Sequence, residues 1–134
     1  MSIERREYER IKVDAKGTFI IKQNEKYIRE FVGDIVDISE VGIKICVNAE
    51  LYEEIISLIN IGNQLTFQGL DKFKLYGSDV TRYFAGRLDI VRMEEKDGTL
   101  IIGCSFKRTG VNDNLLKYID DRKVSVFVER MSLK

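Results

Sequence analysis

Apolar and polar residues alternate along the first third of the chain in a way that predicts β-strands. Over residues 13–21 every second residue is apolar or small, and most residues between them are charged or polar. A strand with one buried face shows this period because successive side chains point to opposite sides. The same period returns over residues 31–38 and 43–47, and the polar, Gly-ended stretch at residues 39–42 predicts that these two strands form a hairpin.

Further along, strand patterns and helix patterns alternate. Residues 49–61 carry apolar side chains at helical spacing and are followed by Gly62, which predicts a helix between strands. Residues 65–67, 80–92 and 100–106 alternate again, and Asp97-Gly98 predicts a tight turn between the last two strands. Residues 70–79 fit no pattern. Residues 112–132 fit a helix, and we expect the apolar face at residues 124–131 to cover the strands.

This order predicts a mainly β protein, a small closed barrel of antiparallel strands with a helix at an open end. We expect the barrel to occupy residues 13–108 and the terminal helix residues 112–132. The chain has no proline and no Gly/Ser linker, so nothing marks a boundary between domains. We therefore expect residues 1–134 to form one domain.

Composition excludes several classes of protein. The 134 residues are 44% hydrophobic and 33% charged, which is enough apolar material for a core. The 22 basic residues balance the 22 acidic ones, so no overall field attracts bulk nucleic acid or an anionic membrane. The N-terminus has no apolar signal segment, and no apolar run is long enough to cross a bilayer. These features predict a cytoplasmic protein without membrane insertion.

Several kinds of chemistry are excluded as well. Without histidine the chain cannot build a Ser-His-Asp or Cys-His catalytic site or a His-bearing zinc site. Cys46 and Cys104 each lie in an apolar, strand-like run, and we expect buried, inert thiols. The paired carboxylates are adjacent in sequence, as in Glu53-Glu54, which is typical of exposed charge. We therefore expect no catalytic residue, no metal site and no cofactor.

Two short motifs stand out. Arg6 and Arg10 form an RxxxR pattern just before the first strand, and Asp37, Ser39 and Gly42 form DxSxxG at the first hairpin. In a chain of this composition RxxxR is expected about 0.7 times by chance, but [DN]xSxxG only about 0.06 times. The two motifs together, in this order, are therefore a specific signal.

The two motifs resemble those of the PilZ domain family, the bacterial receptor module for cyclic di-GMP. The resemblance extends from about Arg5 to the C-terminus and includes Gly103-Cys104-Ser105-Phe106, which is similar to a late GxxF strand of the family. It implies a six- to seven-stranded PilZ-type barrel with an inserted helix and a C-terminal helix. It also implies a non-enzymatic receptor whose ligand, cyclic di-GMP, binds at Arg5, Arg6, Arg10, Asp37, Ser39 and Gly42.

The residue types suit this ligand. A guanidinium can donate two parallel hydrogen bonds to guanine O6 and N7 or to phosphate oxygens, and its plane can stack on a purine. The carboxylate of Asp37 can accept from guanine N1 and N2, the hydroxyl of Ser39 can reach a base or phosphate, and Gly42 leaves room for a turn. The resemblance implies that the arginines contact phosphate and one guanine. The second motif would then hold the other guanine.

The expected mechanism is an order–disorder change. Residues 1–12 contain few apolar anchors, so we expect a flexible ligand-binding arm that becomes ordered on binding. The resemblance implies that the signal passes to an unidentified effector protein that controls motility, adhesion or exopolysaccharide output. The sequence leaves a homodimer open, as it does the binding of one ligand or of an intercalated ligand dimer.

Three alternatives remain open at this level. The first motif could be only a solvated terminus of mixed charge, and the second only a turn in which Asp and Ser cap backbone N–H groups. The chain could then be a PilZ-like assembly module that does not bind nucleotide. A small barrel could also bind single-stranded nucleic acid, although the balanced charge argues against that function.

Overall fold

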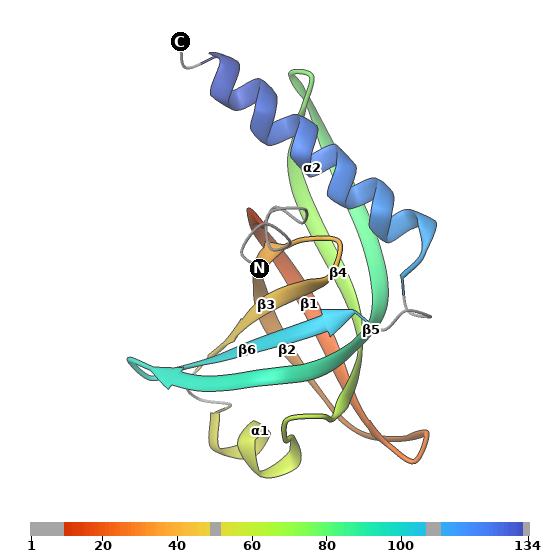
Figure 1. Ribbon diagram of the computed structural model, residues 1–134, viewed down its shortest axis with the longest axis vertical. Helices are drawn as coiled ribbons and strands as arrows, with labels where there is room; N and C mark the ends of the chain where they lie inside the picture. The colour runs from red at the N-terminus through yellow and green to blue at the C-terminus, as the bar shows by residue number, and fades with distance from the viewer. Residues whose placement is uncertain (1–9, 49–51, 107–110, 133–134) are drawn as a thin grey trace, which may run out of the picture.

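Six antiparallel strands form a closed barrel in the computed structural model, which describes residues 10–48, 52–106 and 111–132. Their order around the barrel is β1-β2-β3-β6-β5-β4, and the pairing of β1 with β4 closes the ring (Figure 1). The predicted fold is confirmed, with six strands in the part of the chain described. The strands are β1 (Ile11–Gln23), β2 (Lys26–Ile38), β3 (Gly42–Val47), β4 (Gln64–Leu75), β5 (Ser78–Lys96) and β6 (Thr99–Phe106).

The first strand begins earlier than the sequence predicts. Ile11 is 5% exposed and pairs with Ile38 of β2, so β1 starts two residues before Val13. The apolar side chain of Ile11 reaches the core, and this burial favours its inclusion in the strand. Ile11 and Lys12, which were expected to belong to the arm of residues 1–12, are therefore part of β1.

Tight turns connect three of the strand pairs. The two residues between the strands have positive φ in each turn, a geometry that matches the twist of the flanking strands. The predicted Asp97-Gly98 turn is one of them. The residues are Asn24 and Glu25, Tyr76 and Gly77, and Asp97 and Gly98.

The Tyr76-Gly77 turn explains residues 70–79, which fit no sequence pattern. They are the end of β4, the turn and the start of β5. The alternation is hidden because Asp71, a polar residue, is only 3% exposed, whereas its apolar neighbour Leu70 is half-buried.

The barrel interior is filled by aliphatic side chains and a series of aromatic rings. Phe19 stacks on Phe31 and Phe67, with ring centroids 5.3 and 6.0 Å apart. The series continues through Phe84 to Tyr118 of the terminal helix, whose ring stacks on Phe84 at 3.9 Å. The helix therefore completes the core at one end of the barrel.

That helix, α2 (Asp113–Ser132), confirms the prediction for residues 112–132. Asn112 caps it, because its Oδ1 accepts a hydrogen bond from the backbone N–H of Leu115 at 3.0 Å. The first half of α2 is the half that seals the barrel. Leu115, Tyr118 and Ile119 are each 1% exposed or less.

The second half of α2 is more exposed than the sequence predicts. The face at residues 124–131 was expected to cover the strands, but Phe127 is 63% exposed and Met131 54%. The reason is position, since this half of the helix extends past the barrel beside the β4–β5 hairpin (Figure 1).

The inserted helix is confirmed as α1 (Tyr52–Leu58), within the expected range of 49–61. It ends before Gly62 because Asn60 and Asn63 bond to each other across a turn, and the N–H of Gly62 donates to the carbonyl of Ile90. Among the described residues, no helix has the length and apolar character needed to cross a membrane.

Candidate functional site

The two sequence motifs meet on the outside of the barrel. Arg10 directly precedes β1, Asp37 lies near the end of β2, and Lys12 of β1 pairs in register with Asp37. Nη1 of Arg10 donates a hydrogen bond to Oδ1 of Asp37 at 2.7 Å, across 27 residues of sequence. Arg5 and Arg6 lie outside the described residues. The structure therefore brings together one arginine of RxxxR and the carboxylate of DxSxxG.

Asp37 is the electrostatic centre of this region. Its side chain is 13% exposed, compared with 54% for Arg10. Its second oxygen, Oδ2, lies 3.6 Å from Nζ of Lys44 on β3. One half-buried carboxylate is thus held between the exposed Arg10 and the half-buried Lys44, and a ligand could replace either of them.

Ser39 and Gly42 have structural contacts in the turn between β2 and β3. Ser39 is fully buried, and its Oγ accepts a hydrogen bond from the backbone N–H of Val41 at 3.2 Å. The backbone N–H of Ser39 donates to the carbonyl of Gly42 at 2.9 Å. This is the local capping that the alternative interpretation of the motif expects of serine.

Gly42 is required by a close approach between strands, and its φ is not in the left-handed region. A Cβ at this position would lie 2.2 Å from the carbonyl oxygen of Cys104 on β6. The N–H of Phe106 donates to the carbonyl of Val41 at 2.8 Å on the same side of the turn. The glycine of the motif therefore lets the turn lie directly on β6, and this contact fixes the position of the site on the barrel.

Glu40, at a variable position of the motif, connects the turn to α2. Its Oε1 accepts a hydrogen bond from Nζ of Lys123, while its Oε2 is buried with no hydrogen-bond partner among the described residues. No sequence pattern predicts this contact, because the two residues are 83 positions apart. A change at the turn can therefore reach α2 through one side chain.

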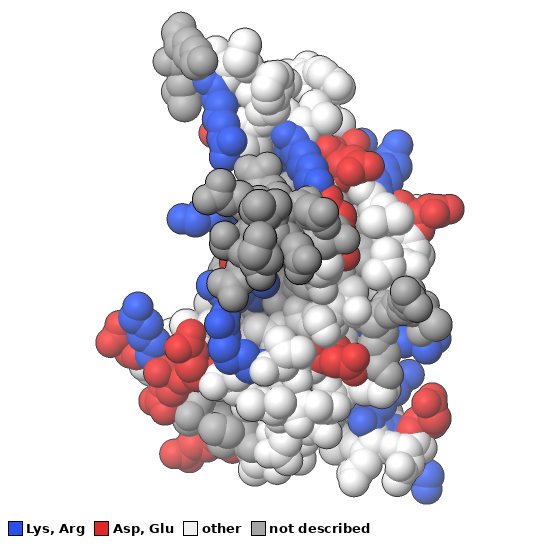
Figure 2. All heavy atoms as spheres, viewed as in Figure 1, with Lys and Arg blue, Asp and Glu red and all other residues white. Residues whose placement is uncertain are grey.

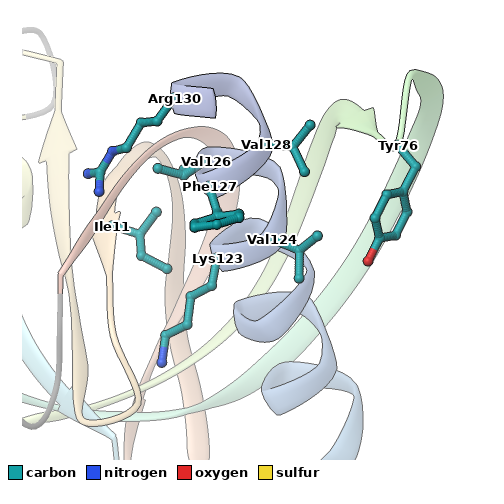
Figure 3. Close-up of a pocket in the computed structure, with 8 residues that line it drawn as sticks. All are labelled: Ile11, Tyr76, Lys123, Val124, Val126, Phe127, Val128 and Arg130. Atoms are coloured by element: carbon teal, nitrogen blue, oxygen red, sulfur yellow. The ribbon is translucent and has the colours of Figure 1, made fainter. Parts of the chain in front are cut away.

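An apolar groove of about 530 Å³ lies along α2. In Figure 3, Lys123, Val126 and Phe127 extend from α2 toward Ile11, while Val124 and Val128 face the side of Tyr76. Two of these lining residues adjoin the site, since Ile11 follows Arg10 in the chain and Lys123 bonds Glu40. The groove and the motif region are thus neighbours.

A buried polar cluster fixes α2 to the β4–β5 pair. The hydroxyl of Tyr118 donates to Oδ2 of Asp71 at 2.7 Å, and Nε of Arg122 lies 3.4 Å from the same oxygen. Burial raises the pKa of Asp71, although the hydrogen bond from Tyr118 and the charge of Arg122 oppose that rise. Burial also raises the pKa of Tyr118, so this residue stays a hydrogen-bond donor.

Solved structures with the same arrangement of strands and helices are found. The PilZ domain of YcgR from Escherichia coli, determined with c-di-GMP, is 16% identical, with a TM-score of 0.58 over 96% of this chain and 94% of that one. The Bacillus subtilis inhibitor of motility, MotI/DgrA, matches with the same identity, score and coverage of this chain. This chain spans about half (52%) of the length of the Bacillus protein.

No protein-family model and no curated protein matches the sequence. The structural matches nevertheless extend over nearly the whole chain. They agree with the resemblance that the two motifs indicate. The chain therefore has the fold of a PilZ domain.

Proposed function

We propose that this protein is a non-enzymatic, cytoplasmic receptor for cyclic di-GMP that signals to a separate partner protein. The observation that carries the proposal is the ion pair between Arg10 and Asp37, which unites the two motifs at one place on a PilZ fold. A structure with the same fold, the PilZ domain of YcgR, was determined with c-di-GMP. The inhibitor of motility from Bacillus subtilis supports a motility output.

In this proposal the ligand replaces the ion pair. The guanidinium of Arg10, with those of Arg5 and Arg6, donates to phosphate oxygens and to guanine O6 and N7. Asp37, released from Arg10, accepts from N1 and N2 of a guanine. An exposed ion pair contributes about 0–1 kcal/mol, so its loss costs the ligand little.

The signal then passes to the surface beside the site. Movement of Arg10 changes the position of Ile11, and movement of the turn changes the contact between Glu40 and Lys123. Both Ile11 and Lys123 line the groove along α2, so a partner bound there would respond to the ligand. Adhesion and exopolysaccharide control are outputs consistent with the same mechanism.

Titration calorimetry with cyclic di-GMP, cyclic di-AMP, GMP and GTP tests the proposal. Adenine presents an N6 donor where guanine presents O6, so each lost bidentate contact costs about 1–3 kcal/mol. We expect binding of cyclic di-GMP and no displacement by an equal concentration of cyclic di-AMP. Equal affinity for the two dinucleotides would show that guanine is not recognised.

A second candidate, a protein-assembly module without nucleotide binding, is favoured by one observation. The exposed side chain of Phe127 lies in the apolar groove, and such surfaces often bind proteins. Binding of a partner through this groove, with no heat from cyclic di-GMP in the same titration, would select this candidate.

A further inference from the structure

One row of residues crosses five strands on the outside of the barrel next to the motifs. In register, Lys12 of β1 pairs with Asp37 of β2, Asp37 with Lys44 of β3, Lys44 with Gly103 of β6, and Gly103 with Arg92 of β5. Residues beside them in the chain, including Ile38, Ile43, Ile45 and Ile102, are buried in the core. The row therefore faces outward.

The row is basic. Lys44 lies near Asp37, and neither Lys12 nor Arg92 has an ion-pair partner in the part of the chain that the structure describes. Together with Arg10, these are four cations and one carboxylate. Figure 2 shows basic side chains on part of this face, and both acidic and basic side chains toward the β5–β6 hairpin. An anionic ligand held at Asp37 and Arg10 is therefore attracted along the row.

Gly103 forms a gap in the row between two cations. The three atoms nearest to a Cβ there would all belong to the side chain of Arg92, with its Cβ at 3.5 Å, Nε at 3.7 Å and Nη2 at 3.8 Å. These are ordinary contact distances, and Gly103 is not among the glycines with positive φ. A glycine inside a strand is normally destabilising by about 0.5–1 kcal/mol relative to alanine. Neither backbone geometry nor these nearest contacts require glycine at position 103. At Gly42, in contrast, the close approach of β3 to β6 does require it.

The absence of a side chain at Gly103 lets the guanidinium of Arg92 lie close to the backbone of β6. Neighbouring strands lie about 4.8 Å apart, so the row from Asp37 to Arg92 spans roughly 14 Å. That length exceeds what a single nucleotide covers and suits a ligand with two bases. A guanidinium can stack on a purine or donate to its O6 and N7.

We propose that Gly103 and Arg92 form a second base subsite, in which one purine of the dinucleotide contacts the guanidinium of Arg92 where it lies beside Gly103. Lys44, between this subsite and Asp37, neutralises a phosphate. This inference rests on the proposed function and adds residues to that site. It gives the glycine at position 103 a role in recognition and gives β5, far from both motifs in the sequence, a direct contact with the ligand.

Three variants, Arg92→Ala, Arg92→Lys and Gly103→Val, test the subsite by calorimetry with cyclic di-GMP and by thermal unfolding. We expect about a tenfold or greater loss of affinity in Arg92→Ala, because a bidentate base contact is removed. Arg92→Lys keeps the charge but loses the planar fork, so its affinity should fall below that of the wild type. Gly103→Val should lose affinity because its side chain displaces the guanidinium of Arg92. Its Tm should stay equal or rise, since valine favours strands and its Cβ lies nearest to side-chain atoms of Arg92, at ordinary contact distances.

Arg87→Ala is the matched control, because Arg87 is exposed on the same strand but pairs with Thr66 of β4. It should bind as the wild type does. If Arg10→Ala loses binding while Arg92→Ala and Gly103→Val bind normally, the subsite is wrong and the proposed receptor function stands. Full affinity in Arg92→Lys would contradict the base contact. A wild-type protein that binds no cyclic di-GMP would overturn the proposed function itself.

Discussion

The motif region and the α2 interface both depend on charged residues, but they differ in how deeply those residues are buried. At the motif region the Arg10 side chain is 54% exposed, so solvent screens its bond to Asp37. At the α2 interface Asp71 is 3% exposed and bonds the buried Tyr118. A ligand can therefore exchange contacts at the first region at little cost, while the second keeps the helix in place.

The exposed contacts are therefore suited to ligand binding, and the buried contacts stabilise the fold. Breaking an exposed ion pair costs about 0–1 kcal/mol, whereas leaving a buried polar group without its partner costs about 1–3 kcal/mol. We expect variants at the motif region to lose ligand but stay folded. Variants at the α2 interface should lose stability but retain ligand.

The largest effect is expected for Gly42→Ala, which should reduce both ligand binding and stability and so does not separate the two properties. A Cβ 2.2 Å from the carbonyl of Cys104 must push β3 from β6, at a cost of about 1–3 kcal/mol. The turn that follows Asp37 moves with β3, and Asp37 itself pairs with Lys44 of β3, so ligand binding should be lost. Urea unfolding and calorimetry measure the two effects. The matched control is Gly103→Ala, at a glycine whose nearest contacts are side-chain atoms, and this variant should unfold at the wild-type urea concentration or a higher one.

Arg10→Ala should separate the two properties. We expect about a hundredfold loss of affinity for cyclic di-GMP, because charge-assisted bonds to phosphate and guanine are removed. The free energy of unfolding should change by less than about 0.5 kcal/mol, as is usual for exposed residues. Arg29→Ala is the control, because Arg29 forms an exposed ion pair with Glu54 away from the motifs. An unfolded Arg10→Ala protein would show that the arginine has a structural role.

Asp37→Ala should lose ligand as well, and slightly more stability than Arg10→Ala. Its removal leaves both Arg10 and Lys44 without their shared carboxylate. Calorimetry and urea unfolding of the same sample measure both changes. Wild-type affinity in this variant would exclude Asp37 from guanine recognition.

Tyr118→Phe should show the opposite behaviour at the α2 interface. The loss of the hydrogen bond to Asp71 should cost about 1–3 kcal/mol of unfolding free energy, with affinity for the ligand unchanged. Tyr83→Phe, at an exposed tyrosine of β5, is the control. A Tyr118→Phe protein that loses ligand in proportion to stability would mean that α2 belongs to the binding site.

The pH dependence of this variant sharpens the prediction. Burial raises the pKa of Asp71 in the folded protein, so the contribution of Asp71 to stability is present below its unfolded pKa and declines as pH rises through the folded pKa. The hydrogen bond from Tyr118 lowers that pKa. Without it the pKa rises further, and the difference in stability between variant and wild type should be greater at pH 7 than at pH 3. Urea unfolding at both pH values measures it.

The smallest effect is expected for Glu40→Gln. The pair formed by Glu40 and Lys123 is partly exposed, so its loss should cost about 0–1 kcal/mol and leave ligand affinity nearly unchanged. The variant should instead uncouple the turn from α2. Hydrogen exchange of α2 should then respond less to the ligand in Glu40→Gln than in the wild type. An identical response would show that the signal does not pass through Glu40.

Much of the fold could be predicted because it rests on local signals. The alternation of β1 and β3, the Asp97-Gly98 turn and the spacing of α2 all reflect burial of one face. The burial of Asp71 could not be predicted from the alternation of apolar and polar residues. This buried acid accepts a hydrogen bond from Tyr118, which is 47 residues away in the sequence. The exposed end of α2 was missed because periodicity shows an apolar face without showing what covers it.

The site was predictable only in part, for a similar reason. The motifs identified Arg10 and Asp37, and the structure places these two side chains in contact. Arg92 and Gly103 could not be assigned because their position beside Lys44 depends on strand register, which no single segment encodes. Ser39 and Gly42 were assigned to the ligand site, and their contacts in the structure are with the turn and with β6. Their contact with a ligand stays a prediction.

The most direct test of the central claim is amide chemical-shift mapping by NMR during titration with cyclic di-GMP. We expect the largest changes at four residues of the proposed binding face, which are Asp37, Val41, Lys44 and Gly103. We also expect smaller changes in α2 around Lys123. We expect none at the Asn24-Glu25 turn, which lies at the other end of the β1–β2 hairpin from Arg10 and Asp37. Changes centred on that turn, or no change at a saturating concentration of ligand, would contradict the claim that the two motifs form a cyclic di-GMP site.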